Sequence, residues 1–299
     1  MILYGAGHFG KMAYQEYGEN VRCFMDSNKG KVEFCGLSVI SIEDYLEANM
    51  EDDIIISTIY YADIIKILIK NGIEKYSIYP QVYMSEDVSK AKEISHGNWP
   101  NKIKEIADFE GFEILEVGSR VVTGANFRDL FERAHYTGFD LYEGPNVDVI
   151  GDAHKLSQYF NKKFDMIFCS AVFEHLAMPW VVADEMIKLC KNGGYIFIET
   201  HYSYENHERP WHFFQFSEQA LKVLFSEKRG IKCIEAGVSN PIIGFFSDQS
   251  STYLRRRAVG NMYCHSGFLG QKVKEVEDLS WGNYVDSEDM GMYPKRIIK

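Results

Sequence analysis

The sequence lacks the cysteine pattern of a disulfide-stapled or zinc-binding protein. Its six cysteines contain no C-x-x-C pair and are spread along the chain at Cys23, Cys35, Cys169, Cys190, Cys233 and Cys264. Isolated cysteines of this kind are typical of buried thiols in a reducing compartment. The pattern therefore excludes a disulfide framework and predicts a cytoplasmic protein.

The sequence also lacks the features of a targeting or membrane-spanning segment. The chain begins with Met1-Ile2-Leu3-Tyr4-Gly5, which has no basic n-region and leads directly into an expected strand. The most apolar stretch, residues 54–69, is interrupted by Asp63 and Lys66. It is shorter than the roughly 20 apolar residues that a membrane helix needs. We expect neither a signal peptide nor a membrane span.

Positive charge is scarce. The chain has 32 Lys and Arg against 43 Asp and Glu, a formal net charge of −11. Its one dense basic run, Arg255-Arg256-Arg257, is more typical of a solvated loop or helix face than of an anion site. An acidic chain without a basic face is a poor partner for phosphate backbones, so nucleic acid is excluded as the substrate.

What is present is a series of four strand-and-turn units between Phe112 and His175. The expected strands are residues 114–117, 136–139, 147–150 and 164–170, each with a polar residue at its C-terminal end or in the turn that follows. In an open parallel sheet the carboxyl ends of the strands line one crevice, where such folds bind ligands. Gly118 lets the backbone approach a ligand, and the Asp140 carboxylate can accept hydrogen bonds from both hydroxyls of a ribose. Asp152 and the Ala153 amide, one strand further on, are placed to bind an adenine edge. The order of these groups along the chain therefore indicates a nucleoside ligand.

Residues 112–225 resemble the S-adenosylmethionine site of class I methyltransferases. The closest resemblance is to a branch common in surface-polysaccharide gene sets, through the motifs EVGSR, YTG-D, GP-VDV, DAH-L and EH. The resemblance implies a cofactor site made of Glu116, Gly118, Ser119, Arg120, Asp140, Asp152, Ala153 and Ser170. One departure is that the usual E-x-G-x-G-x-G loop has Arg120 in place of its second glycine, and the next glycine is Gly124. The family's contacts to the methionine part of the cofactor therefore do not carry over.

Residues 1–85 form a separate α/β module in this interpretation. A G-x-G-x-x-G loop (Gly5, Gly7, Gly10) follows the first strand, and Asp26 follows the second at the spacing of a ribose-binding acid. Three interpretations stay open: an NAD(P) site, a nucleotide-sugar site, and a Rossmann-like packing unit with an empty crevice. The second comes from a resemblance to the N-terminal module of sialic-acid-type sugar acyltransferases, which implies that these four residues bind substrate, with phosphates at the helix N-terminus.

Histidines follow the expected strand that ends at Glu199. His201, His207 and His212 lie within twelve residues, where a methyl acceptor has to sit. Removing a proton from an acceptor hydroxyl suits a histidine. We therefore take His201 and His207, followed by His175, as candidates for the catalytic base. His212, Tyr202 and Arg209 are candidates for substrate contacts; His212 stands where the family pattern has Asp. No diagnostic ligand spacing is present, so we predict no metal, although a divalent metal ion stays open.

The sequence thus predicts an α/β protein with two Rossmann-like domains, the second a doubly wound class I methyltransferase sheet. The expected boundaries are 1–85 for the first module, 86–111 for a linker and helix, and 112–299 for the methyltransferase domain with a C-terminal extension. Residues 270–276 are expected to form a late helix.

The predicted activity is methyl transfer from S-adenosylmethionine to a sugar or nucleotide-linked sugar, on oxygen rather than nitrogen, in surface glycan or natural-product synthesis. The alternatives are an NAD(P)-dependent oxidoreductase and a non-catalytic nucleotide-binding partner. A small-molecule acceptor is the expected partner, and a homo-oligomer stays open.

Overall fold

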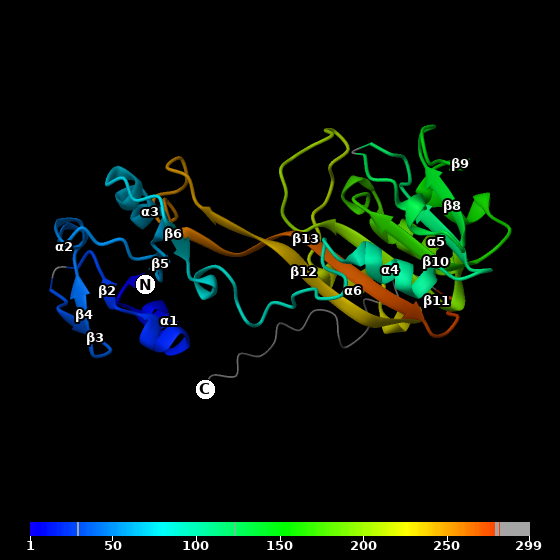
Figure 1. Cartoon of the computed structure of the whole chain (residues 1–299). Coiled ribbons are helices and arrows are strands. Elements are labelled where there is room, and N and C mark those ends of the chain that lie inside the picture. The colour runs from blue at the N-terminus through cyan, green and yellow to red at the C-terminus, as the bar shows by residue number, and fades with distance from the viewer. Residues whose placement is uncertain (29, 123, 279–280, 282–299) are drawn as a thin grey trace. The chain divides into compact units, whose positions relative to one another are not determined.

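The computed structural model describes residues 1–28, 30–122, 124–278 and 281, which fold as two compact units (Figure 1). Met1–Val88 and Pro241–Met262 make the first unit. Ser89–Asn240 and the described residues from Tyr263 onward make the second. The compact units thus differ from the expected division in two places, because residues 241–262 join the first unit and residues 89–111 join the second. Residues 282–299 of the predicted second domain lie outside the described residues.

The first unit is built on a six-stranded sheet of order β3-β4-β2-β1-β5-β6. Its strands are β1 (Ile2–Tyr4), β2 (Cys23–Met25), β3 (Glu33–Phe34), β4 (Leu37–Ile40), β5 (Ile54–Ile56) and β6 (Tyr76–Ile78). Its helices are α1 (His8–Tyr17), α2 (Ile42–Glu47) and α3 (Tyr61–Lys70). All pairs are parallel except β3–β4. Ser41 and Asp44 cap α2 reciprocally, side chain to backbone in both directions.

The second unit contains a seven-stranded sheet of order β12-β13-β11-β10-β7-β8-β9. Its strands are β7 (Glu113–Val117), β8 (His135–Asp140), β9 (Val149–Ile150), β10 (Phe164–Ser170), β11 (Cys190–His201), β12 (Ile231–Phe245) and β13 (Ala258–Lys272). Its helices are α4 (Trp99–Ala107), α5 (Pro179–Leu189) and α6 (Glu218–Leu224). Strands β7 to β11 pair in parallel, and β13 runs antiparallel to β11. This is the doubly wound arrangement that the sequence predicts.

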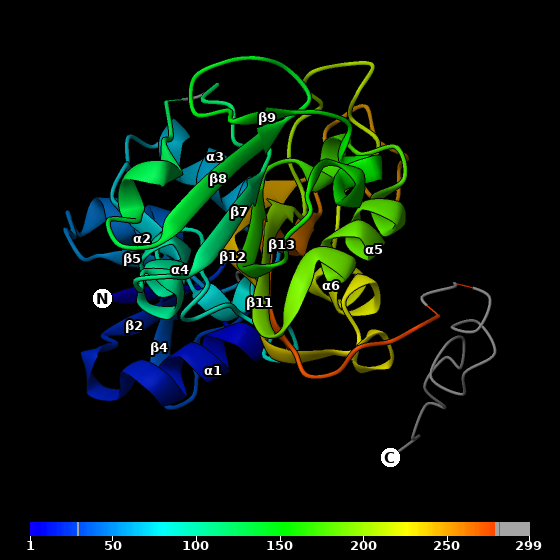
Figure 2. The same cartoon turned by 90° about the vertical axis from the view of Figure 1, so that its right-hand side faces the viewer.

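Helices cover both faces of the central strands (Figure 2). On one face Leu115 and Ile167 pack with α5 and α6, and on the other Ile114 and Phe168 pack with Trp99 of α4. Successive residues of a strand point to opposite faces of the sheet, and strands that are apolar on both faces are typical of a parallel sheet covered by helices on both sides. The second unit therefore has two apolar cores, one on each face of the sheet.

The predicted helix at 270–276 is wrong. Gly270 lies in β13, where it pairs with Ile196 of β11. A Cβ atom on Gly270 would lie 2.6 Å from Ile231 Cγ2, so this position is pressed into the sheet. Residues 270–272 complete β13, and residues 273–276 form neither helix nor strand, so the pairing with β11 decides the conformation here.

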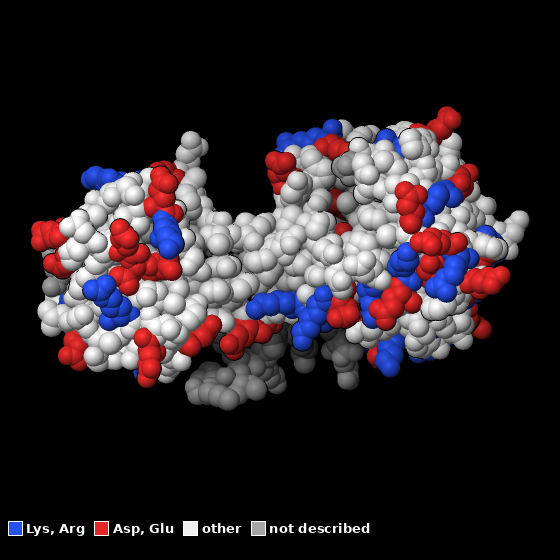
Figure 3. Space-filling model, in the orientation of Figure 1, with Lys and Arg blue, Asp and Glu red and all other residues white. Residues whose placement is uncertain are grey.

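The surface is mixed in charge. On the face shown in Figure 3, acidic and basic side chains are interspersed over the second unit. Among the described residues, the helices are all too short or too polar to cross a bilayer.

Candidate active site

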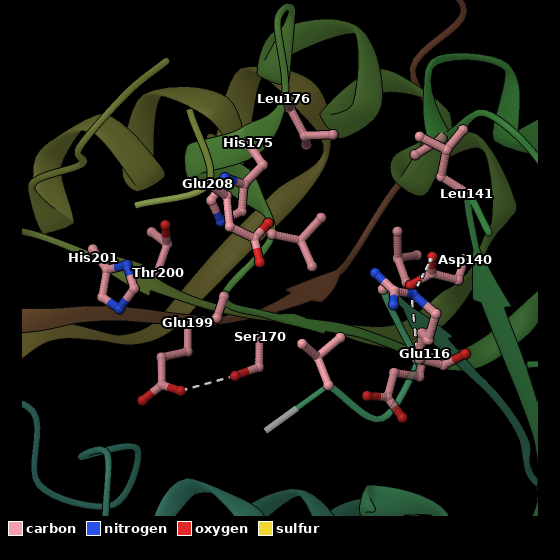
Figure 4. A pocket seen from close by; sticks show the side chains of 18 of the residues that line it. Glu116, Asp140, Leu141, Ser170, His175, Leu176, Glu199, Thr200, His201 and Glu208 are labelled. Carbon is pink, nitrogen blue, oxygen red and sulfur yellow. Dashed lines mark hydrogen bonds and ion pairs between the residues drawn. The ribbon is translucent and has the colours of Figure 1, made fainter. Parts of the chain in front are cut away.

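A cavity of about 960 Å³ lies within the second unit, at the edge where β7, β8, β10 and β11 end. Strand order reverses between β7 and β10, and doubly wound folds bind ligands at such a switch point. The eight residues predicted to hold the cofactor all line this cavity: Glu116, Gly118, Ser119, Arg120, Asp140, Asp152, Ala153 and Ser170. In Figure 4, Glu116 and Asp140 lie on one side of it, Glu199 and His201 on the other.

Glu116, at the end of β7, is 3% exposed. The Tyr136 hydroxyl donates a hydrogen bond to its carboxylate. Burial raises the pKa of Glu116 to about 7, although Tyr136 and Arg128 act in the opposite direction. The cavity therefore contains a carboxyl group that a positively charged ligand would ionise.

Gly118 follows directly and has a φ of +86°. A Cβ atom there would lie 2.2 Å from Val172 Cγ2, in the turn after β10. Only glycine fits this conformation and this close approach without strain. The two turns at the switch point thus pack against each other through Gly118.

Asp140, at the end of β8, is held by the residue that replaces the family's second glycine. The Arg120 amide donates to Asp140 Oδ2 at 3.3 Å, and Arg120 Nε lies 3.6 Å from Oδ1. The Tyr142 amide donates to Oδ1 at 3.0 Å. Arg120 thus contributes its charge to the predicted ribose site, and its Nε is buried without a hydrogen-bond partner.

Asp152 and Ser170 complete the series of strand ends. Asp152 Oδ1 accepts hydrogen bonds from the His154 amide and Nδ1 at 2.9 and 2.7 Å. Burial raises the pKa of Asp152, but these two bonds outweigh it and bring the pKa below its usual value. The Ser170 hydroxyl donates to Glu199 Oε2 at 3.0 Å, as Figure 4 shows.

Three contacts involve the histidines of the opposite wall and the neighbouring Glu174. Glu174 Oε1 and His201 Nδ1 lie 2.8 Å apart, and the Thr200 hydroxyl donates to Glu174 Oε2 at 2.7 Å. His175 Nε2 and His207 Nε2 lie 3.2 Å apart. Burial raises the pKa of Glu174, but His201 and Thr200 together bring it below its usual value. The three predicted candidates for the base thus lie together around one buried carboxylate. We call Glu174, His175, His201 and His207 the histidine–glutamate cluster.

A second group, which the sequence did not indicate, lies beside it. His96 Nδ1 lies 2.8 Å from Glu199 Oε1, and the rings of His96 and His265 stack at 3.9 Å. The hydrogen bond to Glu199 raises the pKa of His96, whereas burial lowers the pKa of His265 to about 4. His96 lies in the segment expected to be a linker, and His265 in the strand β13. No local motif marks either residue, so only the long-range pairing of the sheet could have found them.

The predicted substrate residues of the second domain do not line the cavity, whose wall is formed instead by neighbours such as Tyr204 and Trp211. The His212 ring packs against His207 at 4.7 Å. Tyr202 packs edge-on against Tyr263, and Arg209 is exposed.

In the first unit, the glycine loop is closed by its own contacts. Asp26 accepts hydrogen bonds from the Ala6 and Asn28 amides, both at 2.8 Å. A Cβ atom on Gly10 would lie 2.0 Å from the Gly5 carbonyl oxygen, so Gly10 serves the packing of α1, whereas the space around Gly7 is open. A cavity of about 420 Å³ runs along α1 beside residues 81–86, and it is not lined by Gly5, Gly7, Gly10 or Asp26.

Comparison with known proteins supports one part of this interpretation. Residues 92–236 match the model of a methyltransferase domain family. No curated protein matches the chain. The matched residues fall within the second unit and cover just under half of the chain, and the doubly wound sheet of that unit is the fold that the sequence predicts for a class I methyltransferase.

Several solved structures are similar to about three fifths of the chain. YcgJ from Bacillus subtilis has a TM-score of 0.43 and 15% identity over 60% of this chain and 100% of its own. A SAM-dependent methyltransferase from Aquifex aeolicus has a TM-score of 0.36 and 20% identity over 58% and 89%. The plantazolicin methyltransferase BamL, solved with SAH and a triazolic desmethylPZN analog, has a TM-score of 0.40 and 20% identity over 58% and 85%.

Proposed function

We propose that the second unit binds S-adenosylmethionine and methylates a hydroxyl oxygen of a small-molecule acceptor. One observation carries the proposal: carboxylates and a glycine turn from successive strand ends share a cavity with the three histidines of the histidine–glutamate cluster. The match of residues 92–236 to a methyltransferase domain supports it. The cavity volume of about 960 Å³ is near the upper end for ligand pockets, which leaves room for an acceptor beside the cofactor.

The cofactor end of the cavity offers groups that fit each part of the molecule. Asp140 would accept hydrogen bonds from the ribose hydroxyls, and Asp152 with the Ala153 amide would bind the adenine edge. Glu116, with its pKa near 7, would ionise beside the positive charges of the methionine end. When bound there, S-adenosylmethionine supplies a methyl group on a sulfonium, whose transfer to a hydroxyl oxygen leaves a neutral thioether and requires loss of the hydroxyl proton.

The histidine–glutamate cluster provides the means to remove that proton. His201, His207 and His175 all line the cavity, and Glu174 beside them is fully buried. A buried carboxylate next to an imidazole stabilises the cationic form that arises when the ring takes a proton. We propose that the cluster as a whole activates the acceptor.

A sugar or nucleotide-linked sugar is the acceptor that we propose. Tyr204 and Trp211 give the cavity wall aromatic faces, which suit the apolar faces of a sugar ring, while the cluster suits its hydroxyls. The Rossmann-like first module, residues 1–85, would bind the nucleotide end, and residues 112–299 would carry out methylation. Surface glycan or natural-product synthesis, in the cytoplasm, is the setting that this chemistry fits.

Calorimetric titration with S-adenosylmethionine and S-adenosylhomocysteine tests the proposal. We expect micromolar binding that Asp140→Ala abolishes or weakens strongly. The same protein is then titrated with NADH and with nucleotide sugars, using Asp26→Ala as the variant of the first unit. Absence of binding to either adenosyl compound, together with binding of NADH, would overturn the proposal in favour of an oxidoreductase.

A further inference from the structure

We propose that the histidine–glutamate cluster binds one divalent transition-metal ion, with Zn²⁺ as the best fit. Glu174, His201 and His207 each offer one ligand atom, and the three atoms all lie within 4.8 Å of one another. His175 lies outside this group of three, but its Nε2 contacts the Nε2 of His207. Imidazole nitrogens with one carboxylate oxygen are the ligands that Zn²⁺ prefers in open, three-ligand sites.

The hydrogen bonds of His175 and His207 direct one lone pair of each ring toward the other ring, an arrangement that a cation would stabilise. His175 Nδ1 lies 2.9 Å from the Trp211 carbonyl oxygen, and His207 Nδ1 lies 2.9 Å from the Glu205 carbonyl oxygen. A carbonyl only accepts, so each Nδ1 carries a proton, and each Nε2 of a neutral ring is a bare lone pair. These two Nε2 atoms face each other at 3.2 Å. Lone pairs so placed repel unless a cation lies between or beside them.

The distances suit a shared metal ion. With Zn–N bonds of about 2.0–2.1 Å, two nitrogens at a tetrahedral angle are roughly 3.3 Å apart. A backbone carbonyl on the other ring nitrogen is also how ligating histidines are commonly oriented. His175 and His207 show both features.

The buried carboxylate provides an independent observation. Glu174 is fully buried, and its Oε1 has no hydrogen-bond partner; the same holds for the buried His201 Nδ1 beside it. The two atoms lie 2.8 Å apart and form an ion pair only when the ring is protonated, so with a neutral His201 neither atom has a well-aligned hydrogen bond. A buried carboxylate oxygen needs a cation or a donor, and a metal ion would be the common partner of the carboxylate and the rings.

The neighbouring group shows the contrast. His96, Glu199 and His265 also have ligand atoms within 4.8 Å of one another. There, however, Glu199 is satisfied on both oxygens, by His96 and by Ser170, and His265 Nδ1 contacts the Asn240 side-chain amide at 3.1 Å. Hydrogen bonds account for that group, so the metal is assigned to the histidine–glutamate cluster.

A metal ion here would deepen the proposed methylation without depending on it. Bound at the acceptor end of the cavity, it would lower the pKa of a coordinated hydroxyl and so ease loss of its proton. Metal binding can be measured without either substrate, so a failure of the metal proposal is distinguishable from a failure of the methyltransferase proposal.

The experiment uses the full chain without a polyhistidine tag, stripped with a chelator and titrated with Zn²⁺, Co²⁺ and Mg²⁺. We expect one Zn²⁺ and one Co²⁺ per chain, visible Co²⁺ bands typical of nitrogen ligands, and no Mg²⁺ binding at comparable concentration. His207→Ala and His175→Gln should each weaken Zn²⁺ binding at least about tenfold. His135→Gln, at the opposite end of β8, is the matched control and should change nothing.

Two outcomes would overturn the inference. One is the absence of Zn²⁺ and Co²⁺ binding by a protein that still binds S-adenosylmethionine, which would mean that a shared proton joins His175 and His207 instead. The other is binding that neither His207→Ala nor His175→Gln weakens, which would place the ion elsewhere. Glu174→Gln, followed by a thermal melt to verify folding, serves as the third ligand variant and should also weaken Zn²⁺ binding.

Discussion

Replacing Glu116 with Gln should make the second unit more resistant to unfolding at alkaline pH. The pKa of Glu116 rises from 4.5 to about 7 on folding, because the carboxyl is buried. Between these values the native state keeps a proton that the unfolded chain has lost, so the wild type loses stability as pH rises. At about 1.36 kcal/mol per pKa unit, the loss is about 3 kcal/mol by pH 8. Gln cannot ionise but can still accept from Tyr136, so the variant avoids this loss.

Urea unfolding at pH 4.5 and pH 8, followed by tryptophan fluorescence, measures the effect. The four tryptophans, Trp99, Trp180, Trp211 and Trp281, all belong to the second unit, so the signal reports on that unit alone. The free energy of unfolding of the variant, relative to wild type, should rise by about 3 kcal/mol between the two pH values.

Glu113→Gln, at the other end of β7, is the matched control. Burial raises the pKa of Glu113, but Lys162 and His135 bring it below its usual value. Glu113 therefore stabilises the wild type at neutral pH and loses this effect as pH falls, the opposite trend. Parallel pH profiles for wild type and Glu116→Gln would refute the argument that Glu116 is protonated in the native cavity.

Three further predictions concern the same cavity. Because binding a cation would ionise Glu116, binding of S-adenosylmethionine at pH 6.5 should release protons. Calorimetry in buffers of different ionisation enthalpy detects this release, and the Glu116→Gln variant should show none. Asp140→Ala should weaken S-adenosylmethionine binding by about 10- to 100-fold through loss of charge-assisted hydrogen bonds, whereas Glu143→Ala, an exposed acid in the same loop, should leave the dissociation constant unchanged. Gly118→Ala should lower the melting temperature, because the added Cβ would lie 2.2 Å from Val172 Cγ2 and the backbone φ is +86°. Adding Val172→Ala should restore only part of the loss, since the backbone strain of roughly 1–2 kcal/mol persists. Full restoration would contradict this account.

Sequence reasoning found the cofactor side of the cavity because its signals are local. Each of Gly118, Asp140, Asp152 and Ser170 lies at or just after the end of a strand, and parallel strands bring such positions to one edge. The three candidate bases could be predicted for the same reason, because each follows the end of a strand in the sequence.

The opposite wall could not be predicted in this way. His96 reaches Glu199 across 103 residues of sequence, and His265 depends on the antiparallel pairing of β13 with β11. Tyr202 follows His201 in the chain but packs against Tyr263 instead of lining the cavity. Side-chain direction at a strand end depends on pairing partners, and no single-residue pattern records them.

The path of β12 and β13 affects how the protein can be made. The chain leaves the second unit after Asn240, contributes residues 241–262 to the first unit, and returns to the second unit at Tyr263. Within the first unit, the Asn261 amide donates to the Tyr83 carbonyl, and the Asn261 side chain accepts from the Ser85 amide, 176 positions earlier in the sequence. During synthesis, the first unit therefore cannot complete its fold until residues 241–262 leave the ribosome, long after its own strands have been made. At roughly 5–20 residues per second, that interval lasts on the order of ten seconds or more, during which residues 1–88 remain an incomplete nascent domain.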